Sequence, residues 1–412
     1  MPRSKIIYAW NYVEWGGAQI YTLGLIKFIS NVFDIVVVLP KGSSQELLGF
    51  LNARNIAHEF FEPAADMTAA SGLRPRLRRR MSKRRSEKAL IRKLESLDLS
   101  DSVIHIDLGP QHSLLALARL CRHAPVFFTA HNSLPKFAAW RETVWRIKFR
   151  VIGSFKNFHV FCANVDTFRY ISRFAGKKLL RRTAITPVGI DLEEINRALS
   201  SPELKRKTRE RAGLSENDFV ILTVGQFIDR KGRWILLEAA KQVLEKHPDV
   251  IFLWLMPRLP DEEETERIRG YGLGDSFRPV LSGSVGVTRQ EILRFFRVAD
   301  LFVLPSLLEG LPISLLEAMS LGIPSISTNV NAIPEAIIDG ETGGLIQPGD
   351  PDALSRGIIS LKEDSAMSKR IADTGREFVL KNFDERIAAE KALEMYKKAL
   401  GMSERDVDIP KG

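Results

Sequence analysis

The 412-residue sequence has little cysteine and no long hydrophobic run, and each shortage excludes a class of protein. Two cysteines, Cys121 and Cys162, are too few for a disulfide framework or a cysteine-based metal site. The longest apolar runs, such as residues 35–40 and 301–305, have the length of strands, whereas a membrane-spanning helix needs about 20 apolar residues. The first residues also lack the long apolar region and the cleavage site of a secretory signal. We therefore expect a cytoplasmic protein.

The charge is distributed unevenly along the chain. Residues 1–200 contain 31 Lys and Arg against 16 Asp and Glu, which is +15, and residues 201–412 contain 29 against 34, which is −5. The two halves together give the net charge of +10. This asymmetry indicates an anionic partner for the first half, and nucleic acid, an anionic membrane surface or a phosphorylated substrate would all satisfy it.

Short apolar runs alternate with amphipathic stretches in both halves, which predicts parallel α/β units. Ten runs have the composition of buried strands: residues 5–10, 33–40, 102–109, 124–131, 157–164, 183–189, 219–227, 250–256, 299–306 and 323–329. The predicted fold class is therefore α/β. The charged segment at residues 196–218 is interpreted as the interdomain connection plus a short helix. The last helical run, residues 385–401, either caps the second domain or crosses back onto the first.

Two glycine-containing turns follow predicted strands. Gly16 and Gly17 either let the backbone approach an anionic ligand at a helix N-terminus or simply form a tight turn. Gly225 ends another strand, and the loop after it carries Arg230 and Lys231. A lysine in such a loop either binds a phosphate as a point charge or is an ordinary solvated cation.

The stretch EGLPISLLE, residues 309–317, places two glutamates around the start of an apolar helix. Pro312 near the first helical position costs no hydrogen bond, and the free N–H groups of residues 310–314 suit a diphosphate. Glu309 can accept hydrogen bonds from a polyhydroxylated group, and Glu317 can hold a ribose as an acidic residue does in dinucleotide-binding folds. The alternative is a surface charge at Glu309 and an ordinary helical residue at Glu317.

Together these motifs resemble the retaining glycosyltransferases of family 4, the glycosyl transferases group 1, which have the GT-B fold. The resemblance rests on the E-x7-E motif of Glu309 and Glu317, the loop from Gly225 to Gly232, the turn Gly16-Gly17-Ala18, His131 after a strand, the sequence PVGID at 187–191, and residues 333–350. It extends over nearly the whole chain and is most specific from 299 to 350.

This resemblance implies two Rossmann-like domains facing a central cleft. Residues 1–195, completed by about 385–412, would form the acceptor domain, with the C-terminal helix crossing back to it. Residues 196–384 would form the domain that binds a nucleotide-sugar donor. No metal site and no cofactor are implied, the nucleotide diphosphate sugar being a co-substrate.

The resemblance also implies residue roles. His131, beside the anomeric carbon, and Glu309, against the transferred sugar, are the implied catalytic residues. The implied donor-binding residues are Gly17, Gly225, Gln226, Arg230, Lys231, Gly310, Leu311, Pro312, Ile313 and Glu317, with Lys231 on the phosphates and Glu317 on the ribose. The chain departs from the family pattern at Gln226, where arginine is usual, at the turn after residue 255, and at Asn331-Ala332. Arg230 could supply the charge that Gln226 lacks.

The expected function is retaining transfer of a sugar from a nucleotide diphosphate sugar to an acceptor hydroxyl, in cell-surface polysaccharide or glycolipid assembly. One alternative is a nucleotide-sugar epimerase on the same fold, although no acid/base carboxylates for it stand out in the first domain. The other is a catalytically silent protein that docks on membranes, which would release no nucleotide from a donor.

Residues 73–93 hold eleven Lys and Arg and one acidic residue. Either they contact anionic lipid or they form a solvated loop; nucleic acid is disfavoured because stacking aromatics are missing. Residues 134–153 then repeat Phe137, Trp140, Val144, Ile147 and Val151 at helical spacing. Such a stripe either lies in a membrane interface or packs in the core. Together the two segments favour a sugar or lipid-linked acceptor and a peripheral position at the inner face of the cell membrane.

Overall fold

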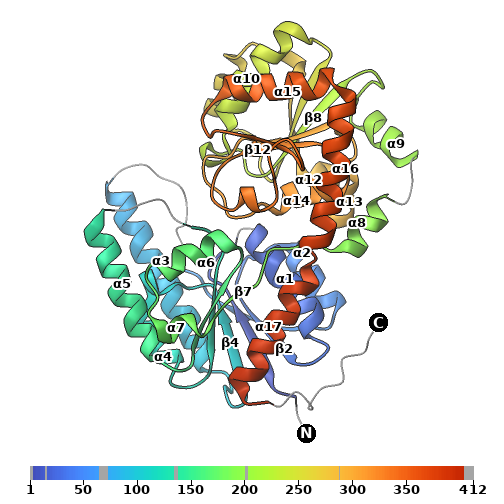
Figure 1. Ribbon diagram of the computed structural model, residues 1–412. Helices are drawn as coiled ribbons and strands as arrows, with labels where there is room; N and C mark the ends of the chain where they lie inside the picture. Colours follow the sequence, from blue (N-terminus) through green and yellow to red (C-terminus); the bar gives the residue numbers. More distant parts are fainter. Residues whose placement is uncertain are drawn as a thin grey trace. The chain divides into compact units, whose positions relative to one another are not determined.

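The computed structural model describes residues 3–13, 16–64, 73–133, 138–199, 203–286 and 288–402. The chain divides into two compact units (Figure 1). The first comprises Met1–Pro187 and Arg386–Gly412, and the second comprises Val188–Glu385. Each unit is built on its own parallel sheet, so the predicted α/β class is confirmed.

In its described part, the first unit contains a seven-stranded sheet in the order β3-β2-β1-β4-β5-β6-β7. The strands are β1 (Lys5–Ala9), β2 (Asp34–Pro40), β3 (Ala57–Phe61), β4 (Ser102–Ile106), β5 (Val126–Ala130), β6 (Phe158–Cys162) and β7 (Thr183–Ile185). The helices are α1 (Gly17–Ile29), α2 (Gln45–Ala53), α3 (Leu73–Glu95), α4 (Pro110–Leu120), α5 (Ala139–Ser154), α6 (Val165–Ser172), α7 (Lys177–Leu180) and α17 (Glu385–Leu400).

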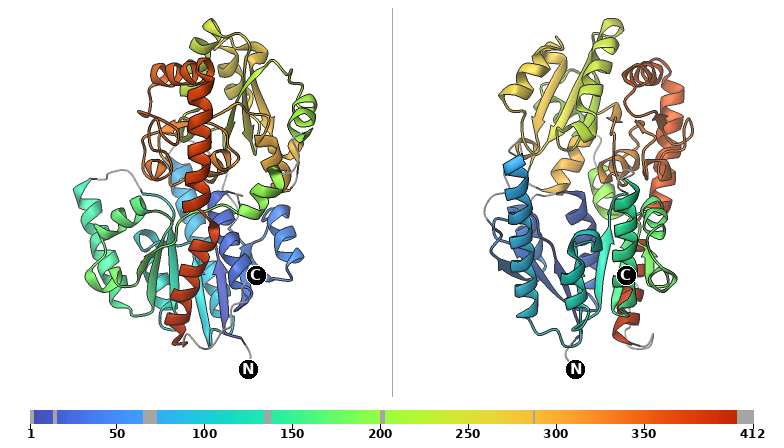
Figure 2. Two further views of the ribbon diagram at one scale, coloured as in Figure 1. Left: turned by 45° about the vertical axis from the view of Figure 1, so that its right-hand side comes forward. Right: turned by 90° about the vertical axis from the view of Figure 1, so that its left-hand side faces the viewer.

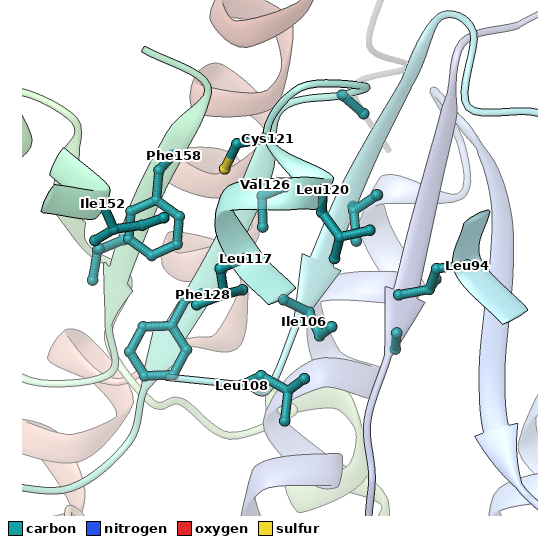
Figure 3. Packing of buried hydrophobic residues seen from close by; sticks show 14 of the residues in the cluster. Leu94, Ile106, Leu108, Leu117, Leu120, Cys121, Val126, Phe128, Ile152 and Phe158 are labelled. Carbon is teal, nitrogen blue, oxygen red and sulfur yellow. The ribbon is translucent and has the colours of Figure 1, made fainter. Parts of the chain in front are cut away.

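The central strands β4, β5 and β6 are buried at every position. Because successive side chains of a strand point to opposite faces, both faces of the sheet are covered there. One face packs against α3, α4 and α5, where Leu94, Leu117 and Ile152 join the strand residues Ile106 and Val126 in one apolar cluster (Figure 3). The basic segment that begins at Leu73 is therefore a helix, and the interpretation as a solvated loop is wrong. The later turns of this helix pack in the core.

The last helix, α17, covers the opposite face of the same sheet. Tyr396 is fully buried, and its ring centroid lies 4.8 Å from that of Phe127. Its hydroxyl lies 3.4 Å from the hydroxyl of Tyr8 and is hydrogen-bonded to Nδ1 of His105. The prediction that the C-terminal helix crosses back to the first domain is thus confirmed.

Two buried histidines make the first unit sensitive to acid. Burial lowers the pKa of His105 to about 3, and burial with the nearby Arg182 and Lys398 lowers that of His159 to about 4. Below about pH 6.5 the unfolded chain therefore binds more protons than the folded one, and stability falls by about 1.4 kcal/mol per pH unit for each histidine until its folded pKa is reached.

We expect chemical unfolding to show a clearly less stable protein at pH 5 than at pH 7. His159→Gln should remove the contribution of one histidine and make this dependence on pH shallower. Equal stability of the wild type at the two pH values would contradict the assignment.

The second unit contains, in its described part, a six-stranded sheet in the order β10-β9-β8-β11-β12-β13. The strands are β8 (Phe219–Val224), β9 (Val250–Met256), β10 (Phe277–Leu281), β11 (Leu301–Leu304), β12 (Ser325–Thr328) and β13 (Gly344–Ile346). The α-helices are α8 (Leu192–Leu199), α9 (Glu203–Arg211), α10 (Arg233–Lys246), α11 (Glu262–Arg269), α12 (Ser282–Val285), α13 (Arg289–Phe296), α14 (Ile313–Ser320), α15 (Pro351–Glu363) and α16 (Ser365–Asn382). Three short 3₁₀ turns are η1 (Asp229–Lys231), η2 (Gly274–Ser276) and η3 (Ile333–Glu335).

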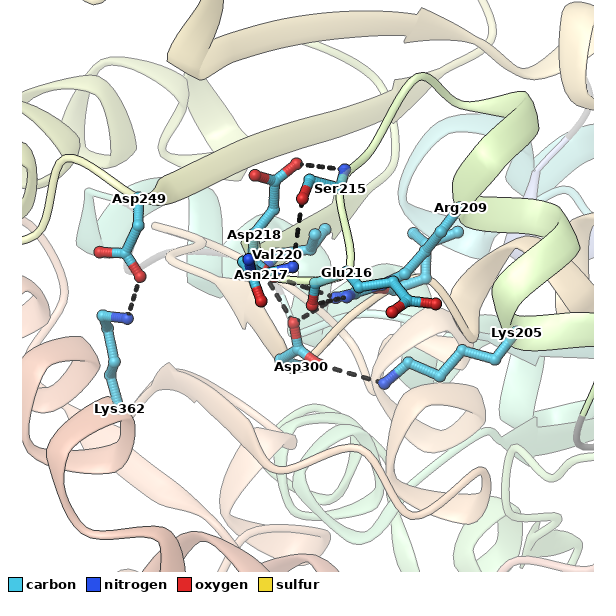
Figure 4. A network of polar contacts seen from close by, with 11 residues as sticks. Lys205, Arg209, Ser215, Glu216, Asn217, Asp218, Val220, Asp249, Asp300 and Lys362 are labelled. Atoms are coloured by element: carbon cyan, nitrogen blue, oxygen red, sulfur yellow. Dashed lines mark hydrogen bonds and ion pairs between the residues drawn. The ribbon is translucent and has the colours of Figure 1, made fainter.

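The charged segment at 196–218 was interpreted as the connection between the domains plus a short helix. The short helix is present as α9, but the segment does not connect the two units. Arg209 of α9 is 8% exposed and forms an ion pair with Asp300, which also lies 3.1 Å from Lys205 and accepts the N–H of Val220 at 2.9 Å (Figure 4). These contacts attach α9 to the start of β8, so the segment is part of the second unit. The predicted boundary after residue 195 lies inside α8, and the structure divides the chain earlier, between Pro187 and Val188.

Candidate functional site

The strand order of the second unit reverses beside β8: β9 and β10 lie on one side of it, and β11 to β13 lie on the other. All six strands are parallel, so the loops that follow β8 and β11 leave the same edge of the sheet as neighbours. Ligands of open α/β sheets bind at such a point. The loop after β8 carries Lys231 and the loop after β11 carries Glu309.

Glu309 holds two cations together. Its Oε1 lies 2.6 Å from Nζ of Lys231 and 3.1 Å from Nη1 of Arg230. Both Glu309 and Lys231 are buried, at 6% and 9% exposure. The hydroxyl of Ser306 donates to the same carboxylate oxygen at 3.3 Å. Because two cations face one carboxylate, the cluster keeps a positive charge, which suits a phosphate.

Two glycines let the loop after β8 pack closely against its neighbours in this cluster. Gly232 has φ of +73°, and a Cβ atom there would lie 1.9 Å from the carbonyl oxygen of Pro305. Gly225 has φ of +144°, and a Cβ atom there would lie 3.3 Å from Cε of Lys231. Larger residues at these two positions would strain the backbone or displace the loop.

Arg230 also lies in the cluster. Its guanidinium contacts Glu309 and donates a hydrogen bond to the carbonyl of Leu308 at 3.1 Å. Gln226 is half-buried at the start of the same loop. A guanidinium is therefore present beside Lys231 even though the position of Gln226 supplies no charge.

Helix α14 begins at Ile313, with Pro312 at its N-cap and not at the first helical position. Gly310, Leu311 and Pro312 are buried, and they lead the chain from Glu309 into the helix. The N–H groups at the start of an α-helix have no partner within the helix, and the helix dipole favours an anion there. The helix start that was predicted to bind the diphosphate thus comes directly after Glu309 in the chain.

Glu317, about one turn after the start of α14, is 5% exposed. It forms an ion pair with Arg289 of α13, whose Nε lies 2.9 Å from Oε2 of Glu194 in α8. Burial raises the pKa of Glu317, and the charge of Arg289 opposes that shift. Arg289 and Glu194 were not predicted from the sequence, because no spacing connects them to the E-x7-E motif.

In the first unit, a small cavity, part of it open to solvent, lies at the carboxyl ends of β1, β4 and β5. His131 and Asp107 line it, with Nε2 of the histidine 4.0 Å from Oδ1 of the aspartate. Burial lowers the pKa of His131, against the weaker opposite effect of Asp107, so its imidazole is neutral at pH 7. Tyr12 is hydrogen-bonded to Asp107.

Asp107 and Tyr12 are further candidates that the sequence analysis missed. Asp107 directly follows β4, and the carboxyl end of that strand meets the end of β5, which precedes His131. The position of Asp107 after a predicted strand is a signal that could have identified it. Thr22 of α1 lines the same cavity, and Gly17 begins that helix.

The structure therefore places the predicted site residues in two groups. His131 and Gly17 lie in the first unit, and the other predicted residues lie in the second. Within the second unit, Arg230, Lys231 and Glu309 are in direct contact, and Glu317 lies further along α14, paired with Arg289.

Two Rossmann-like units, each with polar residues where the strand order of its sheet reverses, form the architecture expected of the GT-B fold. Residues 204–378 match the family model described as Glycosyl transferases group 1. The matched residues all lie in the second unit, and the match supports the predicted family and the predicted enzyme class, glycosyltransferase.

Among its relatives is the UDP-Gal:alpha-D-GlcNAc-diphosphoundecaprenol alpha-1,3-galactosyltransferase of Escherichia coli, 30% identical over 194 residues, which are 45% of this chain and 47% of that protein. Another is the GDP-mannose-dependent alpha-(1-6)-phosphatidylinositol monomannoside mannosyltransferase of Mycolicibacterium smegmatis, 24% identical over 92% of this chain and 94% of that protein. The chain thus spans about half the length of the first relative and nearly all of the second.

Solved structures of low sequence identity share the fold. The structure of Anabaena Alr3699/HepE in complex with UDP-glucose has a TM-score of 0.74 at 18% identity and covers 96% of this chain and 99% of its own. A glycosyltransferase from Rickettsia africae ESF-5 has a TM-score of 0.73 at 18% identity, with 97% and 100% covered. The predicted GT-B fold is therefore confirmed over almost the full chain.

Two kinds of feature are absent from the described residues. No helix among them combines the length and the apolar composition that crossing a membrane requires. No group of three or more His, Cys, Asp or Glu side chains in these same parts of the chain is arranged to hold a metal ion.

Proposed function

We propose that this protein transfers a sugar, with retention of its anomeric configuration, from a nucleotide diphosphate sugar to a hydroxyl of a sugar or lipid-linked acceptor. The observation that carries the proposal is the contact of Glu309 with Lys231 and Arg230 beside the start of α14. It combines, in one buried cluster, a cationic place for a diphosphate and a carboxylate for the sugar attached to it.

The donor would be held by the second unit. Lys231 and the free N–H groups at the start of α14 would bind the diphosphate, Glu317 would accept the ribose hydroxyls, and Glu309 would contact the transferred sugar. Breaking the bond between sugar and phosphate puts negative charge on the leaving diphosphate. Cations and helix dipoles already fixed at that position stabilise the charge as it develops.

The acceptor would be held by the first unit. Asp107, as a carboxylate, can accept a hydrogen bond from an acceptor hydroxyl and thereby orient it. His131 stays neutral because burial lowers its pKa, so it can donate a hydrogen bond to a sugar hydroxyl without adding charge. These roles would make the cavity of the first unit the acceptor side of the reaction.

The nature of the acceptor is proposed from the relatives. The names of the Escherichia coli and Mycolicibacterium smegmatis proteins specify a diphosphoundecaprenol and a phosphatidylinositol mannoside as acceptors of those enzymes. We propose that this protein likewise acts in surface polysaccharide or glycolipid assembly, as a peripheral protein at the inner face of the cell membrane.

A panel of nucleotide diphosphate sugars tests the proposal. Each donor would be scored by the thermal shift that it causes and by slow release of nucleotide in the absence of acceptor. We expect one donor to stabilise the protein and to be hydrolysed slowly. If no donor in the panel produces either effect, the proposed function is wrong.

We further propose that the transfer needs no metal ion and no resident cofactor, because Lys231, Arg230 and the start of α14 supply the positive charge. Nucleotide release should then be unchanged after dialysis against EDTA, and added Mg²⁺ or Mn²⁺ should not restore or raise it. A loss of activity in EDTA that Mg²⁺ reverses would contradict this.

A further inference from the structure

Helix α5 has apolar residues on two opposite faces. Phe149 and Ile152 point into the core and are almost completely buried. On the other side, Trp140, Val144, Ile147 and Val151 are 65%, 39%, 57% and 44% exposed. With 3.6 residues per turn, these four lie within an arc of about 60°. The interpretation of this stripe as core packing is therefore wrong; Phe137, the remaining member, lies outside the described residues.

Cations flank the exposed stripe on both sides. By helical spacing, Arg141 and Lys148 lie along one side of it, and Arg146 and Arg150 lie along the other. The three arginines are exposed. The guanidinium of Arg141 lies 5.3 Å from the ring centroid of Trp140, at the edge of the stripe.

The same face continues over two neighbouring helices. Figures 1 and 2 show α3, α4 and α5 on one side of the sheet, with α4 in contact with both. Leu115 of α4 is 85% exposed and Met81 of α3 is 49% exposed. Lys83 of α3 and Lys148 of α5 both contribute, after burial, to lowering the pKa of His112 in α4. Cations of α3 and α5 therefore lie close to the same part of α4.

We propose that this α3–α5 face, defined by Met81, Leu115, Trp140, Val144, Ile147 and Val151 with the cations around them, docks on a bilayer that contains anionic lipids. An exposed apolar stripe between rows of arginine and lysine is typical of a helix lying in a membrane interface. The cations also match the phosphates of the lipid headgroups in charge. A protein partner would have to supply acidic residues opposite both rows of cations, whereas an anionic bilayer presents negative charge over its whole surface.

The bilayer would be a partner within the proposed function, on which this proposal rests, but binding to vesicles can be measured without turnover. The full-length protein would be sedimented with vesicles of phosphatidylglycerol and phosphatidylcholine, and separately with vesicles of phosphatidylcholine alone. We expect binding to the mixed vesicles only, and weaker binding as salt is raised. The double variants Trp140→Gln/Ile147→Gln and Arg146→Gln/Arg150→Gln should each bind roughly tenfold more weakly or worse.

Two substitutions in the second unit serve as matched controls. Ile338→Gln removes an apolar side chain that is 41% exposed, and Lys381→Gln removes an exposed cation. Both should bind vesicles as the wild type does. All variants should keep the thermal stability of the wild type and its nucleotide release without vesicles, since none of these residues belongs to the site.

Three results would overturn the proposal: wild type that stays in the supernatant with the mixed vesicles, wild type that binds both kinds of vesicle equally, or stripe variants that bind like the wild type. A wild-type dimer that the Trp140→Gln/Ile147→Gln variant converts to monomers in light scattering would also overturn it, because a second copy would then cover the face. Nucleotide release without vesicles tests the proposed function separately, so failure of one is distinguishable from failure of the other.

Discussion

Glu317→Ala is expected to remove the thermal shift caused by the donor and to weaken donor binding roughly a hundredfold or more. A buried carboxylate that accepts two ribose hydroxyls makes two hydrogen bonds to a charged group, each worth about 1.5 to 3 kcal/mol, and about 1.4 kcal/mol corresponds to a tenfold change in affinity. Titration of the wild type and the variant with the donor found in the panel measures the difference.

The fold should survive this substitution, because Arg289 keeps its partner Glu194 at 2.9 Å when Glu317 is removed. Glu317→Gln, which still accepts a hydrogen bond, should lie between the wild type and Glu317→Ala. Glu377→Ala on the exposed side of α16 is the matched control and should bind donor normally. Equal donor affinity of Glu317→Ala and the wild type would exclude Glu317 from the site.

Lys231→Met is expected to lower kcat by about two to three orders of magnitude, the loss typical of removing one group that stabilises developing charge. The lysine meets the strongest negative charge only when the diphosphate leaves, so KM should change much less than kcat. Lys231→Arg should recover only part of the rate, because a planar guanidinium does not replace a point charge in a buried position. Steady-state kinetics with the chosen donor separates kcat from KM.

Glu309 keeps Arg230 as a partner when Lys231 is replaced, so the variant should fold with only some loss of stability. Its unfolding temperature must be measured alongside its kinetics. Lys241→Met, at an exposed position of α10, is the control for loss of a lysine. Arg230→Gln should have a smaller effect than Lys231→Met, because Lys231 is the nearer cation to Glu309 and is the more buried. A raised KM with unchanged kcat in Lys231→Met would mean that the lysine binds the donor without stabilising the departing diphosphate.

The sequence predicted the central strands of both sheets and missed β3, β10 and β13. All three lie at the edge of a sheet. A central parallel strand is covered on both faces and reads as a continuous apolar run, as in residues 250–256. An edge strand is not under that constraint: β3 is half-exposed, β10 contains Pro279 and β13 has only three residues.

The predicted site shows the same distinction between local and distant information. Glu309 and Lys231 could be selected because each lies in a local motif after a strand, but their direct contact follows from the pairing of β8 with β11, which no local pattern states. Arg289 comes from another helix altogether. The stripe on α5 could not be assigned to core or surface from its spacing, since both faces of that helix are apolar and only the packing of α4 shows which one is covered.

The position of α17 determines when each unit can fold as the chain is synthesised. The second unit is continuous, from Val188 to Glu385, and all of its residues are available once that stretch has left the ribosome. The first unit contains the earlier strands, yet one face of its sheet lacks Tyr396 until the second unit and α17 have been made. Domains generally fold as units during translation, so the unit that is synthesised first is the last to be completed. Until then, Tyr8 and His105 lie on an uncovered sheet, which is the surface that a chaperone would have to protect.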